Sequence, residues 1–159
     1  MLVPQAIQDG FVAGTNAIQG TTMKVADHAA PIGSFTDPEY AQVGLTEAKA
    51  REEFDVVTAT LHFDSATRRI IDGRTEGFCK LIADRKTHKI LGYHVVGDRA
   101  VEITQVAAVA MAAQMRVDDL AQVPFSFPIY AGALGLVAAK IINQFNLNLS
   151  WRADLIEGA

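Results

Sequence analysis

Cysteine is almost absent from this sequence, which has 159 residues and a single cysteine, Cys79. One cysteine excludes a disulfide within the chain, a CxxC redox pair and a zinc site built from several cysteines. It also fits a reducing compartment, where thiols stay unpaired.

An excess of basic residues and long hydrophobic runs are missing too. The 14 Lys and Arg stand against 18 Asp and Glu, a net charge of −4, which argues against nucleic-acid partners and polybasic membrane patches. The two most apolar stretches, residues 106–115 and 131–142, are too short to cross about 30 Å of hydrocarbon. A signal peptide has basic residues before an apolar run, and the N-terminus here has none. We expect a cytoplasmic protein with no nucleic-acid and no membrane partner.

Motifs that hold phosphates or build common catalytic sites do not occur. The sequence contains no GxGxxG after a strand, no GxxxxGK[ST], no GxSxG and no HExxH. A nucleotide therefore has no obvious phosphate cradle, and neither a hydrolase nucleophile nor this type of zinc site is indicated.

Apolar residues make up 50% of the chain and charged residues 20%, which suits one globular domain with a real core. Thr46 and Asp98 are predicted helix N-caps. Hydrophobic periodicity predicts strands at 34–36, 41–44, 56–63, 77–84 and 90–96, and helices at 5–18, 46–53, 99–115, 118–122 and 130–145. Because the strands follow one another as hairpins, we predict an α+β fold, an antiparallel sheet of hairpin-connected strands covered by helices.

The four histidines, His28, His62, His88 and His94, have no i, i+3 or i, i+4 spacing. We interpret them as surface or hydrogen-bonded side chains, although histidine is the usual base or metal ligand when a site exists. No metal site is predicted. Cys79 shares a strand face with apolar residues, so we expect a buried inert thiol. The alternative, a reactive thiolate, would need a basic neighbour.

The region from Phe125 to Ile142 is rich in aromatic and large aliphatic residues. It is either an ordinary core helix together with the segment that precedes it, or an oligomer interface, where such residues concentrate. Periodicity alone does not decide between the two.

Three segments resemble the dimerisation domain of the pyridine nucleotide–disulfide oxidoreductases, the FAD enzymes that include dihydrolipoamide dehydrogenase, glutathione reductase and mercuric reductase. They are SFTDPEYAQVGLTEA (34–48), TEGFCKLI (75–82) and KILGYHVVG (89–97) followed by Ala100 and Glu102. The resemblance covers about residues 31–145. It implies a homodimer with Phe125, Phe127, Pro128, Tyr130 and Leu134 in its interface.

Residues 2–6, with Gly10, resemble the end of the family's FAD domain, where a helix begins beside the flavin. The resemblance therefore places Val3 and Pro4 beside FAD in a complete enzyme. It divides the chain into a remnant of an FAD domain (1–20), a linker (21–32) and a dimerisation domain (33–159). The family's Gly-rich FAD fingerprint, redox cysteine pair and NAD(P)H domain have no counterpart in these residues.

Most of the family has a His-Pro pair with a Glu five residues after the His. The His and the Glu together act as acid and base. Phe127 and Gly132 occupy the two positions here, and neither can carry a proton. The mercuric-reductase-like branch also lacks this His, so that branch stays open. We therefore predict no catalytic residue in this chain.

The resemblance implies a dimerisation domain of an FAD- and NAD(P)-dependent flavoprotein that is not catalytic alone and holds no cofactor by itself. Its partner would be a second copy of the chain. Two alternatives stay open: an oxidoreductase completed in trans by a polypeptide carrying the FAD and NAD domains, and a repurposed small-molecule-binding domain.

Overall fold

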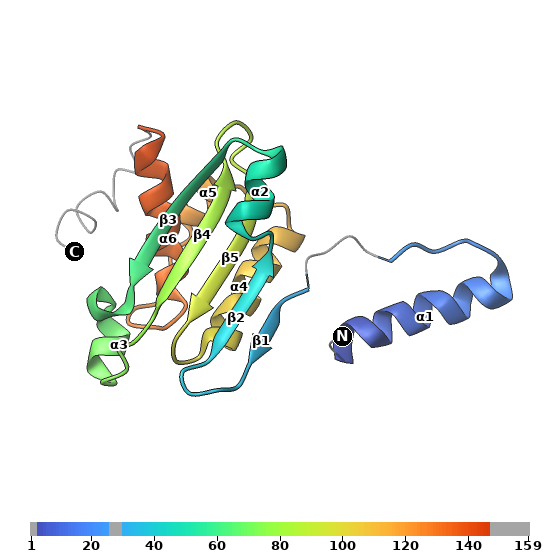
Figure 1. Cartoon of the computed structure of the whole chain (residues 1–159), viewed down its shortest axis with the longest axis horizontal. Helices are drawn as coiled ribbons and strands as arrows, with labels where there is room; N and C mark the ends of the chain where they lie inside the picture. The colour runs from blue at the N-terminus through green and yellow to red at the C-terminus, as the bar shows by residue number, and fades with distance from the viewer. Residues whose placement is uncertain (1–2, 26–29, 147–159) are drawn as a thin grey trace.

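The computed structural model describes residues 3–25 and 30–146 (Figure 1). Its centre is one antiparallel sheet in the order β1-β2-β5-β4-β3. The strands are β1 (Ile32–Ser34), β2 (Tyr40–Gly44), β3 (Val56–His62), β4 (Phe78–Asp84) and β5 (Ile90–Val96). The predicted α+β class is confirmed, since neighbouring strands pair antiparallel and hairpins join β1 to β2 and β4 to β5, while a longer connection joins β3 to β4.

Alternation along the strands produces one apolar face. In β3, Val57, Ala59 and Leu61 are buried, whereas Thr58 and Thr60 between them are half-buried. The neighbouring strand aligns its own buried residues with these, so that Leu61 pairs with Cys79 and Ala59 with Leu81. Since side chains alternate with a period of two, this register directs the apolar sets of both strands to the same core.

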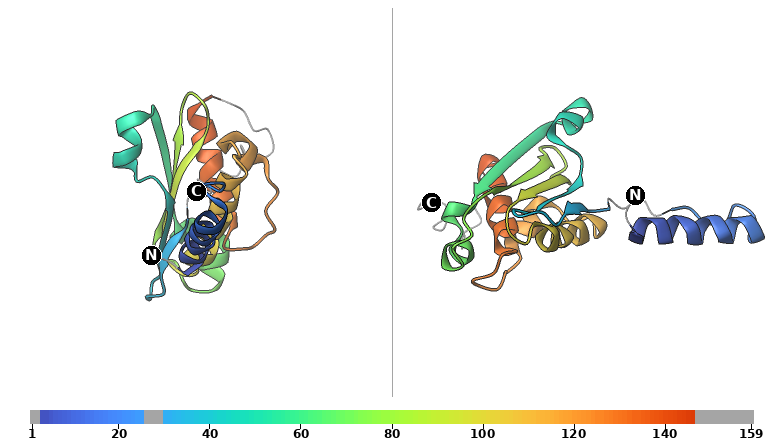
Figure 2. Two further views of the ribbon diagram at one scale, coloured as in Figure 1. Left: turned by 90° about the vertical axis from the view of Figure 1, so that its right-hand side faces the viewer. Right: turned by 60° about the horizontal axis from the view of Figure 1, so that its bottom comes forward.

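Helices cover that apolar face (Figure 2). The helix α4 (Ala100–Ala112) packs on β2 and β5, and α6 (Gly132–Gln144) packs on β3 and β4. The short helix α5 (Val117–Gln122) lies against α6. The buried alanines of α4 and α6 let the helices approach the sheet closely, and they form one core with it.

The helix α2 (Glu47–Glu53) lies on the opposite face of the sheet (Figure 2). As predicted, Thr46 caps it: the Thr46 hydroxyl accepts a hydrogen bond from the Lys49 backbone N–H, which satisfies a donor that the helix leaves free. Beneath α2 is a small second core of Ala50, Phe54, Val56, Ile82 and Leu91.

The start of α4 differs from the prediction. Asp98 does not cap it, because Arg99 takes the N-cap position in the left-handed conformation (φ 56°) and Asp98 lies one residue further out. The Glu39 carboxylate, from the turn before β2, instead accepts a hydrogen bond of 3.1 Å from the Val101 N–H. The helix also ends at Ala112, not at Met115. A residue distant in sequence therefore does the capping.

The connection between β3 and β4 contains two short helices that the sequence analysis missed: η1 (Phe63–Ser65) and α3 (Thr67–Ile71). They are too short for a helical period to show in the sequence. The connection closes at Gly77, which has φ 105° and where a Cβ would overlap the Val96 carbonyl oxygen. Gly77 belongs to the TEGF segment, so the backbone conformation at this position explains why the motif has a glycine there.

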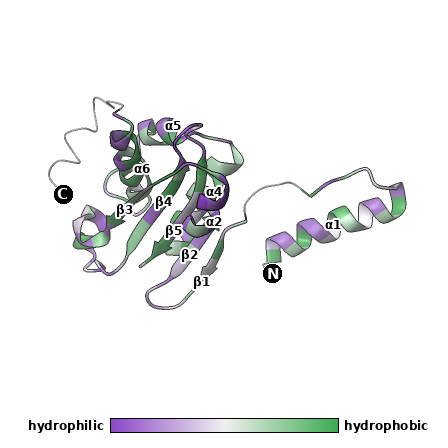
Figure 3. Cartoon of the chain, turned by 45° about the horizontal axis from the view of Figure 1, so that its top comes forward, coloured by the Kyte–Doolittle hydropathy of each residue, from purple (hydrophilic) through white to green (hydrophobic). Residues whose placement is uncertain are grey.

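The helix α1 (Val3–Gln19) confirms the predicted N-terminal helix and extends away from the sheet (Figure 1). Apolar and polar residues mix along it (Figure 3), and none of its residues is buried. Four of its large apolar side chains, Val3, Ile7, Phe11 and Ile18, are exposed. Helices of this kind usually gain their stability by packing an apolar side.

Candidate functional site

The segment between α5 and α6, residues 123–131, carries most of the residues that the resemblance places in an interface. The Phe127 side chain is 81% exposed, and Ile129 is 41% exposed. Phe125 and Tyr130 are half-buried and pack against the main core. Leu134 is different: it is fully buried in the chain's own core, which leaves it no surface for a second copy.

A cavity of about 480 Å³ lies between this segment, α3 and α6. Phe125, Phe127, Pro128 and Tyr130 all contribute to its wall, so four of the five predicted interface residues surround one hollow. Its charged wall residues are all basic: Arg68, Arg69 and Lys140. None of the described wall residues is Asp, Glu or His, so no group in the wall is an obvious general base.

Arg69 is the unusual member of this wall, because its side chain is only 1% exposed. The guanidinium carbon lies 3.3 Å from the centre of the Phe63 ring and 4.9 Å from the centre of the Tyr130 ring. None of its three nitrogens has a hydrogen-bond partner within the described residues. Burial lowers the pKa of Arg69 from its usual value, yet arginine stays charged in proteins. The Phe63 and Tyr130 rings therefore provide close contacts to a buried cation that has no hydrogen bond among the described residues.

Tyr130 joins the segment to α3. Its hydroxyl donates a hydrogen bond of 2.6 Å to Asp72, whose carboxylate also accepts from Arg68. The hydrogen bond from Tyr130, followed by that from Arg68, lowers the pKa of Asp72. Burial and the hydrogen bond to Asp72 raise the pKa of Tyr130 to about 12. The phenol is thus a neutral donor at physiological pH.

Phe127 and Gly132 both line the same cavity, so the two positions that correspond to the family's His and Glu do lie together. A phenyl ring and a hydrogen atom replace the imidazole and the carboxylate. Neither group can transfer a proton.

Cys79 lies in β4 and is fully buried. Desolvation raises the pKa of its thiol to about 11, so it is protonated at neutral pH. The prediction of a buried thiol is confirmed, and the shift is opposite to that of a reactive cysteine.

The described histidines are distributed over separate parts of the fold. His94, on the sheet face away from α6, has its Nε2 3.0 Å from the Leu45 carbonyl oxygen. The exposed His62 lies beside Phe78. The predicted surface or hydrogen-bonded character is confirmed for these two, and His28 lies outside the described residues.

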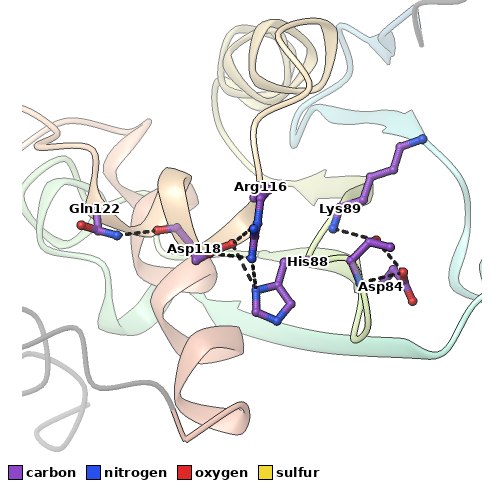
Figure 4. Close-up of polar contacts among 7 residues, drawn as sticks. Asp84, His88, Lys89, Arg116, Asp118 and Gln122 are labelled. Atoms are coloured by element: carbon purple, nitrogen blue, oxygen red, sulfur yellow. Dashed lines mark hydrogen bonds and ion pairs between the residues drawn. The ribbon is translucent and has the colours of Figure 1, made fainter.

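His88, in the β4–β5 hairpin, contacts Arg116 and Asp118 (Figure 4), and it also contacts Phe145. Its Nδ1 lies 3.0 Å from Arg116 Nη2 and 3.2 Å from Asp118 Oδ1, and its ring stacks on Phe145. These contacts join the hairpin to α5 and to the end of α6. We interpret them as a structural connection, since His88 is one of several groups that already satisfy one another.

Val3 and Pro4, the residues that the resemblance places beside FAD, form the start of α1, and Val3 is 73% exposed. A helix start leaves backbone N–H groups free for an anionic group. Among residues 3–25 and 30–146, no group of three or more His, Cys, Asp or Glu side chains could hold a metal ion. Within the same ranges no helix is long and apolar enough to span a bilayer.

Comparison with known proteins agrees with the fold. The chain is 36% identical to a mercuric reductase of Lysinibacillus sphaericus over 84% of its own length and 24% of the relative. It is also 36% identical to a dihydrolipoyl dehydrogenase of Synechocystis over 76% of its length and 26% of the relative. The chain thus spans about a quarter of these curated relatives.

A solved structure of LpdA from Mycobacterium tuberculosis superposes with a TM-score of 0.77, at 25% identity, over 87% of this chain and 30% of that one. The HOCl-induced flavoprotein disulfide reductase RclA of Escherichia coli superposes with a TM-score of 0.73 at 25% identity over 82% of this chain and 31% of that one. Residues 30–138 match the family described as "Pyridine nucleotide-disulphide oxidoreductase, dimerisation domain". The chain therefore belongs to the dimerisation-domain family of the pyridine nucleotide–disulfide oxidoreductases.

Proposed function

We propose that this chain forms the homodimer contact of an FAD- and NAD(P)-linked reductase and contributes no proton-transferring group to the reaction. The observation that carries the first part is the protrusion of Phe127 and Ile129, large apolar side chains that are 81% and 41% exposed. Apolar groups gathered on a surface mark interaction sites. Phe125, Phe127, Pro128 and Tyr130 form the proposed contact, and Leu134 is omitted because it is buried.

A twofold axis through this segment would pair the patch with its own copy. A lasting dimer buries on the order of 1,200 Å² or more, so the segment alone is not enough. On α4, Val109 is 61% exposed and Val106 is 37% exposed, which provides further apolar surface. Light scattering on a size-exclusion column tests this: we expect twice the chain mass of 17.1 kDa. A monomer at micromolar concentration would refute the proposal.

The absence of proton transfer rests on Phe127 and Gly132, which share the wall of one cavity but carry no titratable group. A complete enzyme with this domain would reduce an acceptor that needs no base from this position. A mercuric-reductase-like activity is one such possibility, because the chain is as similar to those relatives as to dihydrolipoyl dehydrogenases.

FAD and NAD(P) enter this proposal through the family, and the described residues fit FAD at one point only. Val3 and Pro4 supply a helix start that could face a flavin. When bound, FAD would supply the electron transfer. Other residues that hold it would come from FAD and NAD domains, either continuous with this chain or on a separate polypeptide that completes the enzyme in trans. Co-expression with such domains, followed by purification through this chain, would yield a yellow complex if the proposal is right.

We also place the protein in the cytoplasm, with a role in cell redox homeostasis. A lone buried thiol suits a reducing compartment, and the proposed complete reductase would exchange electrons with a nicotinamide cofactor. Fractionation of cells that express a tagged chain would test the location.

A further inference from the structure

The segment that carries the proposed dimer contact, residues 123–131, has little backbone hydrogen bonding of its own. Pro124 and Pro128 have no N–H group. Among the described residues, no N–H of residues 126–131 donates a hydrogen bond to another backbone group. A segment without such bonds keeps many conformations unless side chains restrict it. The position of Phe127 therefore depends on the side chains that anchor the segment.

Tyr130 is anchored at its hydroxyl. This hydroxyl donates a hydrogen bond of 2.6 Å to the carboxylate of Asp72, the C-cap residue of α3. Asp98, which precedes α4, acts on the same hydroxyl: burial, then Asp72, then Asp98 raise the pKa of Tyr130. One phenol of the interface segment is thereby connected to the end of α3 and to the start of α4.

Two guanidinium groups lie beside the Tyr130 ring. The guanidinium carbon of Arg69 is 4.9 Å from the ring centre, and that of Arg99 is 5.0 Å from it. At these distances an aromatic ring attracts a cation. Arg69 belongs to α3 and Arg99 is the N-cap residue of α4, so the same two elements contact the ring and the hydroxyl. Asp98 also favours the charged form of Arg69, and the five side chains therefore form one connected group around Tyr130.

Arg99 has a backbone conformation that is unfavourable for an arginine. Its φ of 56° lies in the left-handed region, which glycine adopts without steric cost. Capping does not explain the arginine, because its side chain makes no capping hydrogen bond to α4. Its guanidinium lies beside Tyr130 instead and favours the ionised form of Asp72. The strained position thus points to a role at Tyr130.

We propose that Asp72, Asp98, Arg69 and Arg99 hold Tyr130 so that the interface segment has its dimer conformation before a second copy binds. This inference rests on the proposed homodimer and identifies positioning residues for its contact. A segment that is already in the bound conformation loses less conformational entropy on association, which lowers the dissociation constant. Asp72 and Arg99 therefore influence dimer affinity through Tyr130.

Tyr130→Phe tests the hydroxyl, because it keeps the ring and removes only the donor. The dissociation constant of the dimer at neutral pH should rise about 10-fold, since both copies lose a hydrogen bond to a charged group. Tyr40→Phe is the matched control: Tyr40 is 50% exposed on β2, outside the proposed contact. It should leave the dissociation constant within about twofold of the unchanged chain. Sedimentation over a concentration series measures the constants, and circular dichroism checks that each variant folds.

Asp72→Ala, alone and combined with Tyr130→Phe, shows whether Asp72 acts through Tyr130. Alone, it should weaken the dimer about as much as Tyr130→Phe does. Added to Tyr130→Phe, it should change the dissociation constant by less than about twofold, because the hydroxyl that it positions is already missing. Effects that add in full would show that Asp72 acts independently of Tyr130, and the proposal would be wrong.

Arg99→Gly separates positioning from fold stability. Glycine suits the left-handed backbone, so the variant should resist urea at least as well as the unchanged chain. Loss of the cation beside each Tyr130 ring should nevertheless raise the dissociation constant about 5-fold. An unchanged constant would overturn the role of Arg99.

Failure of this inference and failure of the proposed homodimer give different results. If the unchanged chain is a monomer, both are refuted. If it is a dimer whose dissociation constant does not respond to Tyr130→Phe, only the positioning role of the Tyr130 contacts is overturned.

Discussion

The Tyr130 hydroxyl and the Asp72 carboxylate are 58 residues apart in sequence and form a hydrogen bond of 2.6 Å. This contact holds the exposed aromatic segment against α3 and closes one side of the cavity. No periodic pattern in the sequence connects these two residues. Its consequences are open to measurement through the titration of Asp72.

Tyr130→Phe should raise the pKa of Asp72, because it removes the strongest of the interactions that lower it. A depressed carboxyl pKa adds stability above the unfolded value of about 3.9, and this contribution is lost as the pH falls through the folded value. The variant should therefore be less stable than the unchanged chain at pH 6, with the difference shrinking below about pH 4. Urea unfolding between pH 2.5 and 7 measures this. A difference that stays constant with pH would contradict the assignment.

Phe127→Ala should weaken the proposed dimer. Burial of a phenylalanine side chain contributes about 1.5–3 kcal/mol, and a twofold axis doubles the loss, so the dissociation constant should rise about 100-fold or more. Phe35→Ala is the matched control, because Phe35 is 84% exposed and lies in the β1–β2 turn. Sedimentation across a concentration series would compare both variants. Equal effects of the two substitutions would exclude a specific role for Phe127.

The purified chain should carry no flavin and should not oxidise NAD(P)H. One helix start at Val3 and Pro4 cannot offset the entropy cost of association, which is several kcal/mol or more. An absorption spectrum after purification, followed by addition of free FAD, checks this. A flavin spectrum near one equivalent per chain would refute the expectation.

In a complete reductase that carries this domain, His94→Ala should leave turnover within about twofold of the parent. His94 lies on the sheet face opposite α6, with its Nε2 beside the Leu45 carbonyl, so it cannot reach the position of Phe127. A working general base contributes about 100- to 10,000-fold. A loss of that size with flavin and dimer intact would identify His94 as the missing base. The converse test combines Phe127→His with Gly132→Glu. It asks whether restoring the imidazole and the carboxylate changes the pH dependence of turnover.

The Cys79 thiol should resist labelling in the folded chain at pH 8. Its pKa of about 11 leaves little thiolate, and burial blocks access. A disulfide reagent should react with less than a tenth of the chains under native conditions and with one thiol per chain in urea. Rapid native labelling would mean that Cys79 is more accessible than its position in β4 allows.

Element types were predictable where the local signal was strong. Alternation identified β3, β4 and β5, and the Thr46 hydroxyl identified the start of α2, because these features depend on residues within one turn or one strand. The start of α4 was not predictable in the same way. Its capping carboxylate comes from Glu39, and no local pattern connects residue 39 to residue 101.

The same distinction between local signals and tertiary contacts applies to the candidate site. The sequence by itself determined that Phe127 and Gly132 can carry no proton, that one cysteine cannot form a pair, and that most of residues 125–142 are apolar. Only the tertiary structure decided that Leu134 faces inward while Phe127 faces outward, since a helical period defines a side but not what covers it. Likewise Arg68 and Arg69 are adjacent and chemically identical. Arg69 is buried and Arg68 is not, because successive side chains of α3 point in different directions and only one direction meets Phe63 and Tyr130.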